Sequence, residues 1–579
     1  MTERAYQGVG IDLGTTYSSL AYMDAQMTPR VVSDSEGNTV MPSVVYFDDD
    51  EVIVGEIALS MAKLDADRVA QFIKVNMGDN WRREFNGKVH TPESISALIL
   101  GQLVREAEPQ IGLISGAVIT VPAYFTEKRR RATQQAGEIA GLNVLGTLNE
   151  PMAATLAYGL YRVNKEEIAV VYDLGGGTFD VTVVHIAPNL LEELTTKGNR
   201  QLGGRDWDQA LIDYVCDDFK KKHGNDPRED KQAIQDLYLE CERSKRRLGR
   251  MHKTSIRLHA FGHDHTSSVT KKEFEAITAH LLQTTKLTTE LALEDANLTW
   301  KDVTRIVLVG GSTNMPVVRD MLRQASGISP DVAVNPVTAV ALGAATYAHM
   351  LETGLEIDAI RFQQKVEELE SVIMIDDDEA PSSLPTAMLV SDHDLAPVVP
   401  ARPEVRFVTA HGVGLRVHTQ HGMRNRVLIP SNTPVPASVT RRFTATGKGS
   451  GGAHIRIEIT QGDSEDCELV EHLGTGRIEL PHKEPPGNPV DVTMEFDRQS
   501  RLHTHAVYVK TGQEMSMTVD VKGCLHQNEV DDYRNFLVNS GFAKPFDSQA
   551  AIARLEEIDL DEDDDMDDDG LPMFEPILE

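Results

Sequence analysis

Residues 170–184 read VVYDLGGGTFDVTVV, and this stretch decides how the chain folds. Apolar runs flank a glycine-rich turn on both sides, a pattern that predicts a β-hairpin. Glycines carry no Cβ, so their backbone N–H groups can approach a ligand closely and form a concavity that suits phosphate. Asp173 ends the first strand beside this turn. A carboxylate next to a phosphate needs a cation between them, usually Mg²⁺, although a tight hairpin that binds nothing is the alternative interpretation.

A second stretch has the same form. Residues 9–21 read VGIDLGTTYSSLA, which is again a strand, an Asp-Leu-Gly turn and a strand. Its Asp12 precedes Asp173 by about 160 residues, roughly one domain length, so the two stretches indicate a duplicated fold. Two such hairpins, facing each other, would hold a polyphosphate and its metal ion between them.

Both hairpins resemble the phosphate loops of the heat-shock protein 70 (Hsp70) chaperones, which belong to the actin-like ATPase superfamily. Three further stretches resemble the same family: VITVPAYF at 118–125, LNEPMAA at 148–154 and IVLVGGST at 306–313. The resemblance is strong over residues 8–350 and weaker over 405–520. Together with the composition, it predicts four parts: an α/β actin-like two-lobed ATPase domain of duplicated fold (1–351), an extended acidic and proline-rich tether (352–404), a β-sandwich peptide-binding-like domain (405–525), and a short helical segment with a disordered acidic tail (526–579).

The resemblance also implies roles for single residues, with ATP or ADP and Mg²⁺ as cofactors. Lys74 falls at the family's phosphate-contacting lysine, and the alternative interpretation is a solvated cation on a helix or loop. Glu150 follows a strand and would orient the attacking water. Asp12, Asp173 and Thr178 would place the metal and the phosphates, with the two aspartates as metal ligands.

The other nucleotide contacts implied by the resemblance are Gly14, Thr15, Thr16, Tyr17, Gly175, Gly176, Gly177, Gly203, Gly204, Glu242, Lys245, Arg246, Gly310, Gly311, Ser312 and Asn314. Three positions depart from the family at the adenine: Asn314 replaces a stacking arginine, Val337 an aspartate and Gly249 a serine. Stacking and cation–π contacts are worth about 1–2 kcal/mol. We therefore expect weaker nucleotide affinity or looser base selectivity, with the phosphate end complete.

Local patterns predict several helices and one exposed face. Residues 58–75 have helical spacing, and a helix should open at Thr91 with a proline just inside its cap. Another should run from 126 to 140 and end at Gly141. Its basic cluster at 128–131 is interpreted as a solvated face, although the resemblance gives Arg130 a role in coupling domains. Residues 232–248 form a charged helix that, without the resemblance, would be an ordinary surface helix.

The C-terminal third is interpreted from composition. Residues 376–403 are acidic and proline-rich, which is typical of a flexible tether, and VRFV at 405–408 is the candidate linker. Short alternating strands over 405–521 predict a β-sandwich. Four apolar residues fall near the family's pocket for an extended peptide, although they could equally be core. They are Val417, Phe443, Ile455 and Ile457.

The family has a long helical lid after this domain, and we expect a divergent member without the full lid. Short helices are predicted at 530–537 and 549–558, with a possible extension of the first domain's last helix over 352–362. The acidic block at 556–569 predicts disorder by self-repulsion. The apolar LPMFEPIL at 571–578 is either a docking motif for a partner or a segment that returns to the chain's own pocket.

Composition restricts the partners and the compartment. A net charge of −32 argues against nucleic acid as a partner. The four cysteines are far apart and form no CxxC pair, which fits a reducing cytoplasm. We see no signal peptide, and no apolar run approaches the roughly 20 residues of a membrane-spanning helix. A cytoplasmic location, away from membranes, is therefore predicted.

The favoured function is an ATP-dependent chaperone of Hsp70 type, a slow ATPase that controls the binding of unfolded or extended polypeptides. Its expected partners include a J-domain co-chaperone and a nucleotide-exchange factor. The alternative is a nucleotide-gated scaffold or regulatory protein with little ATP hydrolysis, which the altered adenine positions favour. A sugar kinase of the same superfamily is disfavoured by the β-rich region and by the sequence around Glu150.

Overall fold

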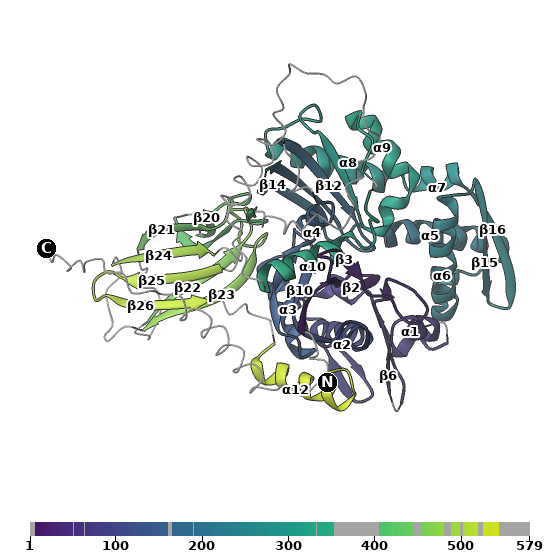
Figure 1. Cartoon of the computed structure of the whole chain (residues 1–579), viewed down its shortest axis with the longest axis horizontal. Helices are drawn as coiled ribbons and strands as arrows, with labels where there is room; N and C mark the ends of the chain where they lie inside the picture. Colours follow the sequence, from purple (N-terminus) through teal and green to yellow (C-terminus); the bar gives the residue numbers. More distant parts are fainter. Residues whose placement is uncertain are drawn as a thin grey trace, which may run out of the picture.

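The computed structural model describes residues 6–49, 51–62, 64–159, 165–188, 190–331, 333–352, 404–420, 422–444, 454–479, 488–497, 502–518 and 525–543. Figure 1 shows two lobes, each around its own sheet, and a third, all-β region beside them. Most of the predicted tether, the helix at 549–558 and the acidic block lie outside the described residues, as does the predicted helix at 352–362 beyond Glu352.

The first lobe is built around a mixed sheet. Its strands are β1 (Tyr6–Asp12), β2 (Tyr17–Met23), β3 (Pro29–Val31), β4 (Met41–Pro42), β10 (Leu113–Val121) and β11 (Val144–Asn149). The strand order is β11-β10-β1-β2-β3, and β4 pairs with β2. β1 and β2 pair antiparallel, while β10 is parallel to β1. The hairpin predicted over residues 9–21 is therefore confirmed.

The second lobe repeats this plan. Its strands are β12 (Glu167–Leu174), β13 (Phe179–Ala187), β14 (Leu190–Asn199), β17 (Arg305–Val309) and β18 (Glu404–Arg406). The order is β17-β12-β13-β14-β18. β12 and β13 form an antiparallel hairpin, and β17 is parallel to β12. Both sheets therefore contain the same three parts in the same order: a parallel neighbouring strand, an antiparallel hairpin and a third strand antiparallel to its hairpin neighbour. A duplicated fold predicts this repetition.

Two helices pack between the sheets, α4 (Glu150–Ala157) and α10 (Ala339–Glu352). They share an apolar core with strands of both lobes. A Cβ on Gly343 would lie 1.6 Å from the Ala153 carbonyl oxygen, and one on Gly10 would lie 2.0 Å from the Ala345 nitrogen. Glycine at these two positions allows α10 to approach both α4 and β1, which joins the lobes at their base (Figure 1).

Helices and small sheets cover the outside of the first lobe. They are α1 (Glu56–Met61), α2 (Pro92–Ile111), α3 (Glu127–Ile139), β5 (Val44–Phe47), β6 (Val52–Val54), β7 (Val69–Gln71), β8 (Arg83–Phe85) and β9 (Lys88–His90). Thr91 and Ser94 cap the start of α2 reciprocally, with proline as the first helical residue. The helix starts predicted at Thr91 and Thr126 are both confirmed.

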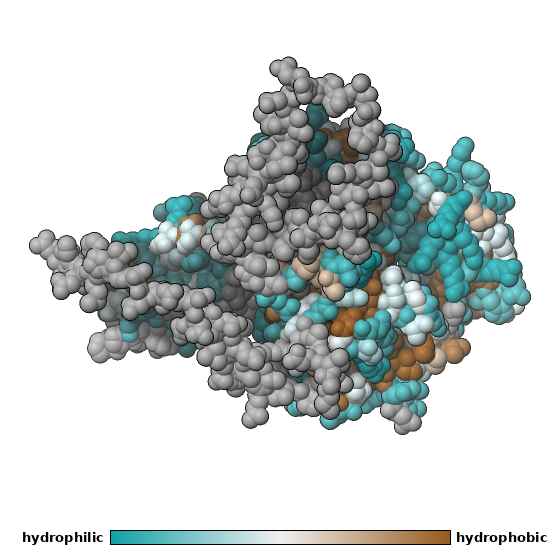
Figure 2. Space-filling view, viewed as in Figure 1, coloured by the Kyte–Doolittle hydropathy of each residue, from teal (hydrophilic) through white to brown (hydrophobic). Residues whose placement is uncertain are grey.

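The second lobe has a different outer layer. It contains α5 (Gly204–His223), α6 (Lys231–Leu248), β15 (Lys253–Ala260), β16 (His263–Thr270), α7 (Lys271–Ile277), α8 (Ala279–Asp295) and α9 (Pro316–Ser326). The exposed side of hairpin β15–β16 is hydrophilic in Figure 2, because its residues alternate between buried and exposed. α5 begins at Gly204, and Asp206 lies in its first turn.

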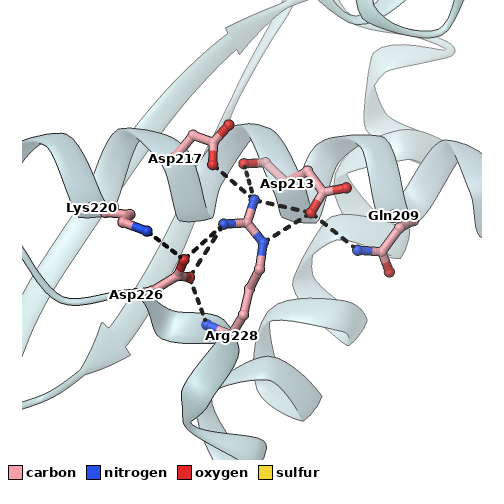
Figure 3. Close-up of polar contacts among 6 residues, drawn as sticks. All are labelled: Gln209, Asp213, Asp217, Lys220, Asp226 and Arg228. Carbon is pink, nitrogen blue, oxygen red and sulfur yellow. Dashed lines mark hydrogen bonds and ion pairs between the residues drawn. The ribbon is translucent and has the colours of Figure 1, made fainter.

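An ion network joins α5 to the short turn η4 (Pro227–Glu229) that precedes α6 (Figure 3). The Arg228 guanidinium donates to Asp213, Asp217 and Asp226, with N–O distances of 2.9–3.2 Å for the shortest contact to each. Burial lowers the pKa of Arg228, but the hydrogen bonds to Asp217 and Asp213 outweigh it and hold the pKa above its ordinary value. The network fixes the entry into α6, which carries several predicted nucleotide contacts.

The helix predicted over residues 58–75 is wrong. The chain instead forms α1, a 3₁₀ turn η1 (Ala66–Arg68), strand β7 and a second 3₁₀ turn η2 (Ile73–Asn76). β7 pairs with β5, so sheet pairing overrides the apolar spacing. Phe72 adopts a left-handed conformation with φ of 60°, which no continuous helix accommodates. The break leaves the Lys74 side chain buried.

The interpretation of residues 128–131 as a solvated face is wrong for Arg129 and holds only in part for its neighbours, since the Arg131 side chain is 39% exposed. Arg129 is only 4% exposed and donates to both carboxylate oxygens of Asp79 at 3.0 and 3.1 Å. Arg130 donates to the Ala123 carbonyl oxygen at 3.1 Å. This face of α3 is covered because η2 and the turn after β10 pack against it.

The third region contains two four-stranded antiparallel sheets. Their strands are β19 (Val413–Thr419), β20 (Gly422–Ile429), β21 (Ala437–Thr444), β22 (His454–Gln461), β23 (Glu471–Glu479), β24 (Pro489–Phe496), β25 (Leu502–Tyr508) and β26 (Gln513–Thr518). The orders are β20-β19-β22-β23 and β21-β24-β25-β26. Both sheets contribute to one apolar core, which includes Ile459 and Met494.

Two segments attach this region to the lobes. β18 pairs parallel with β14, with Val405 opposite Leu191, so the VRFV segment extends the sheet of the second lobe. After the third region, α12 (Gln527–Asn539) packs on α2 and α3 of the first lobe (Figure 1). Tyr533 there donates to the Val89 carbonyl oxygen at 2.8 Å, and Leu537 is fully buried. The helix predicted at 530–537 is thus confirmed. No helix in the described ranges is both long and apolar enough to cross a membrane.

Candidate functional site: two glycine turns and a buried ion pair

The turns of the two predicted hairpins meet between the lobes. A Cβ on Gly176 would lie 2.0 Å from Thr16 Oγ1, and one on Gly177 would lie 2.8 Å from Thr15 Cγ2. A third turn joins them, because a Cβ on Gly203 would lie 2.5 Å from the Gly177 nitrogen. Only residues without a side chain allow such an approach, so the glycines bring backbone N–H groups of three turns together.

Hydrogen bonds fix these turns from the second lobe. Gly204 N donates to the Gly175 carbonyl oxygen at 2.9 Å, and Ser312 Oγ donates to the same oxygen at 2.8 Å. Gly310 has φ of 82°, and a Cβ there would lie 2.8 Å from Asp173 Oδ1. The turn at Gly310 therefore passes directly beside the Asp173 carboxyl group.

A buried ion pair lies beside the turns. Lys74 Nζ donates to Glu150 Oε1 at 2.5 Å, and the two side chains are only 6% and 8% exposed. Thr120 Oγ1 donates to Asp12 Oδ1 at 3.3 Å. η2 positions Lys74, and the junction of β11 with α4 positions Glu150. Each charged group is thus placed at the end of a short or rigid element.

The carboxyl groups here have strongly raised pKa values. Burial, and then the charge of Glu150, raises the pKa of Asp12 to about 7. The same two causes raise the pKa of Asp173 well above its ordinary value and that of Asp180 to about 8. Burial lowers the pKa of Lys74, but the charges of Glu150 and Asp12 outweigh it and hold the pKa above the ordinary value. Because carboxyls outnumber the single lysine, a further cation would stabilise the ionised cluster.

Asp12 and Asp173 fit Mg²⁺ rather than a metal held by protein alone. In the part of the chain that the structure describes, no three His, Cys, Asp or Glu side chains converge as a metal cage. Mg²⁺ needs only one or two carboxylates, because water and phosphate supply its other ligands. Two carboxyls next to glycine turns, Asp173 buried and Asp12 partly buried, meet that requirement.

The C-terminal end of α6 forms the far side of the site. Lys245 Nζ donates to Asp208 Oδ2 at 2.8 Å. Arg246 donates to Glu242 Oε1 at 2.5 Å and to the hydroxyl of Tyr17 at 2.8 Å. Since Tyr17 begins β2 of the first lobe, the arginine bridges the two lobes. Asn314 ends the 3₁₀ turn η5 (Gly311–Asn314) and is exposed.

The structure thus brings the predicted nucleotide residues together in two groups. The residues at the glycine turns and the ion pair are Asp12, Gly14, Thr15, Thr16, Lys74, Glu150, Asp173, Gly175, Gly176, Gly177, Thr178, Gly203, Gly204, Gly310 and Ser312. Those along α6 and η5 are Tyr17, Glu242, Lys245, Arg246, Gly311 and Asn314.

Sequence reasoning missed four polar residues of the site. Asp180 lies directly opposite Asp173 in the hairpin, a pairing that the strand alternation contains. Thr120, Asp208 and Arg319 hold Asp12, Lys245 and Asn314 respectively. The contacts of Thr120 and Asp208 join segments that are distant in the sequence, and that of Arg319 joins a 3₁₀ turn to a helix. No local sequence pattern signals any of the three.

The four candidate peptide-contacting residues do not share one environment. Ile457 is 7% exposed and belongs to the core of the third region. Val417, Phe443 and Ile455 are half-buried and pack against that core from three different strands. Their side chains are therefore partly accessible, whereas Ile457 has a packing role.

Comparisons with known proteins agree on one family. The sequence profile described as Hsp70 protein matches residues 8–377. A "Chaperone protein DnaK" of Thermotoga petrophila is 36% identical over 540 residues, which cover 92% of this chain and 83% of that protein. Proteins of the same name from Thermosipho africanus and Deinococcus radiodurans are each 35% identical, over 95% and 91% of this chain and 85% and 81% of their own lengths.

Proposed function

Because this chain belongs to the Hsp70 family, we propose that it is an ATP-dependent chaperone in which Mg·ATP binding and hydrolysis between the lobes control the binding of extended apolar polypeptide segments. One observation carries the catalytic part of the proposal. It is the buried Lys74–Glu150 ion pair, set beside two glycine turns and two carboxyls. Buried charged groups with strongly shifted pKa values, set in a site of this kind, are concentrated at functional sites.

Each residue at the turns has a role in the proposed reaction. The backbone N–H groups of Gly176 and Gly177 hold phosphate oxygens, together with Thr178, while the Gly175 N–H closes the turn by donating to the Thr178 carbonyl oxygen at 3.0 Å. Lys74 balances charge that develops on the transferring phosphoryl group, and Glu150 orients the attacking water. Asp12 and Asp173 would hold Mg²⁺, which neutralises phosphate charge when bound. The enzyme would be a slow ATPase that forms ADP and phosphate.

Contacts between the third region and the lobes support coupling. β18 extends the sheet of the second lobe. A ring nitrogen of His411 lies 3.1 Å from the Tyr124 carbonyl oxygen, and Gln461 Oε1 accepts from Glu127 N at 3.1 Å. A change in the angle between the lobes would strain one attachment or the other, because the first two anchor points lie on different lobes. Nucleotide state can therefore bias the third region between arrangements that differ in peptide affinity.

The finer assignments belong to the same proposal. The two sheets of the third region form a β-sandwich peptide-binding domain over 405–525, after an ATPase domain over 1–351 and a tether over 352–404. Val417, Phe443 and Ile455 contact the peptide, supported by Ile457 beneath them. A J-domain co-chaperone and a nucleotide-exchange factor are the expected partners, and the location is the cytoplasm. The fourth part (526–579) begins with α12 on the first lobe. The exposed Asn314, in place of a stacking arginine, favours a nucleotide-gated scaffold as the second candidate.

Single-turnover hydrolysis of Mg·ATP, with and without an extended apolar peptide, tests the proposal. A coupled chaperone hydrolyses the bound ATP and does so faster when the peptide is present. Tight ATP binding with neither hydrolysis nor a peptide response would instead establish the scaffold. Phosphorylation of a small molecule would point to the sugar kinase.

A further inference from the structure

The wall of the proposed nucleotide site runs from the phosphate turns to Asn314. It begins at Gly310, beside the Asp173 carboxyl, and continues through Ser312, which donates to the Gly175 carbonyl oxygen. It ends at Asn314, which is exposed. A nucleotide whose phosphates occupy the glycine turns must therefore extend its base towards Asn314, a step that rests on the proposed function.

The opposite side of this end leaves space for a base. A Cβ on Gly311 would meet only Val337 Cγ2, at 3.9 Å. One on Gly249, at the end of α6, would lie 3.2 Å from the Arg246 carbonyl oxygen of its own last helical turn and otherwise meet only Pro316 Cδ, at 3.9 Å. Arg246 is already engaged, because it donates to Glu242 and to the Tyr17 hydroxyl. Of the polar side chains of η5, Ser312 and Thr313 are buried and that of Asn314 is exposed.

Arg319 fixes which way that amide points. Arg319 lies on α9, and its Nη2 donates to Asn314 Oδ1 at 3.2 Å. A guanidinium group only donates hydrogen bonds, so the amide oxygen must face Arg319 and the amide nitrogen must face away. α9 is held by Val318 and Leu322, both fully buried, so Arg319 has a rigid base. Within the described residues, Asn314 Nδ2 has no acceptor of its own.

An asparagine with a free amide reads adenine through two contacts: its oxygen accepts from the N6 amino group, and its nitrogen donates to N7. Here Oδ1 is occupied, which leaves only the donor. N7 is an acceptor in adenine and in guanine alike, and pyrimidines lack it. We propose that Asn314 recognises purine N7 through Nδ2, with Arg319 as its positioning residue, so that the site selects purine nucleoside triphosphates without strong preference for adenine over guanine.

Base analogues test this assignment directly. The full-length protein is titrated with the Mg²⁺ complexes of ATP, GTP, CTP and 7-deaza-ATP, which has carbon in place of N7. ATP and GTP should bind with Kd values within about threefold, while 7-deaza-ATP should bind roughly fivefold more weakly than ATP, the factor expected for one net hydrogen bond. Equal affinity for ATP and 7-deaza-ATP, or strong preference for ATP over GTP, would overturn the proposal. If none of the four binds, the proposed function itself fails.

Variants separate the two residues. Asn314→Ala should abolish the difference between ATP and 7-deaza-ATP. Arg319→Leu frees Oδ1 for the adenine N6 amino group, so the preference for ATP over GTP should rise roughly fivefold. Arg319→Lys keeps a donor and should keep the wild-type ratio of ATP to GTP affinity.

Arg323→Leu, on the same helix but paired with Asp320, is the matched control and should leave the affinities for all four nucleotides unchanged. An unchanged ATP-to-GTP ratio in Arg319→Leu contradicts the positioning role, and this ratio does not depend on how much of the variant folds.

Discussion

The phosphate end of the proposed nucleotide site and its base end lie on the same two lobes, but they differ in burial and in redundancy. At the phosphate end, Lys74 and Glu150 are almost fully buried and three backbone turns interlock. At the base end, Asn314 and Arg246 are exposed. Asn314 is held by Arg319, and Arg246 is held by Glu242 and the Tyr17 hydroxyl. Buried charges are costly to rearrange, whereas exposed contacts are worth little individually. The chain can therefore change how it holds a base without disturbing the chemistry.

The largest effect should come from the phosphate end. Glu150→Gln keeps the size of the side chain but removes the charge that orients water and pairs with Lys74. We expect the single-turnover rate constant for Mg·ATP hydrolysis to fall by roughly 100-fold, as for loss of a general base. Lys231→Ala, an exposed lysine on α6 whose side chain is 83% exposed, is the control and should retain the wild-type rate. Near-normal hydrolysis by Glu150→Gln would contradict the role of Glu150.

The interlocked turns should be the next most sensitive feature. In Gly176→Ala the new Cβ would lie 2.0 Å from Thr16 Oγ1, so the two hairpins must separate. We expect the affinity for Mg·ATP, measured by calorimetry, to fall roughly tenfold or more, since a shift of about 1 Å at a positioned site has effects of this order or larger. The double variant Gly176→Ala, Thr16→Gly should recover part of the loss. Gly146→Ala, where a Cβ meets nothing within 4 Å, should bind as the wild type does.

A third test uses pH and the nucleotide-free protein. Burial, and then Glu150, raises the pKa of Asp180 to about 8, so Asp180 is protonated in the folded protein over a range in which it is ionised in the unfolded chain. Its contribution to stability is fully present below the ordinary pKa of about 4 and is lost as pH rises towards 8. Asp180→Asn should therefore gain stability relative to the wild type as pH rises from 5 to 8, measured as the difference in Tm.

Asp24→Asn provides a control of opposite sign. The hydrogen bond from Arg30 and those from backbone N–H groups lower the pKa of Asp24. Its contribution is present above the ordinary pKa and is lost as pH falls through the lowered value, so Asp24→Asn should show no such trend between pH 5 and 8. A flat Tm difference for Asp180→Asn over this range would mean that the carboxyl is ionised in the folded protein.

The smallest effect lies outside both ends. Arg228→Ala removes the arginine that holds three carboxylates at the entry to α6 (Figure 3). Because its side chain is 34% exposed and solvent screens these pairs, we expect a loss of about 1 kcal/mol in chemical denaturation. Nucleotide affinity should stay unchanged, which would separate loss of stability from loss of function. A tenfold loss of affinity would show that the entry to α6 positions the site.

Local sequence predicted the two hairpins because glycine runs between alternating apolar residues admit few other structures. It also predicted the start of α2, where Thr91 and the proline after it encode the cap. It failed at residues 58–75, because pairing of β7 with β5 and the left-handed Phe72 depend on strands elsewhere in the chain. The burial of Arg129 likewise depends on Asp79, which is distant in sequence.

The same distinction holds for the site. The positions of Lys74, Glu150 and the glycines followed from resemblance to a family whose backbone is shared. The contact of Arg319 with Asn314 did not, because it joins a 3₁₀ turn to the following helix and no local pattern signals it. Departures from a family pattern can be found in the sequence, but the side chain that contacts the changed residue is found only in the structure.

The most direct test of the difference between the two ends is single-turnover hydrolysis of saturating Mg·ATP and Mg·GTP by the wild type and by Lys74→Ala. If the phosphate end alone controls the chemistry, the wild type should hydrolyse both nucleotides with rate constants within about threefold, and Lys74→Ala should lower both by roughly 100-fold, the usual cost of removing one preorganised group that stabilises developing charge. A saturated wild-type rate that is far slower with GTP, or normal turnover by Lys74→Ala, would contradict the account.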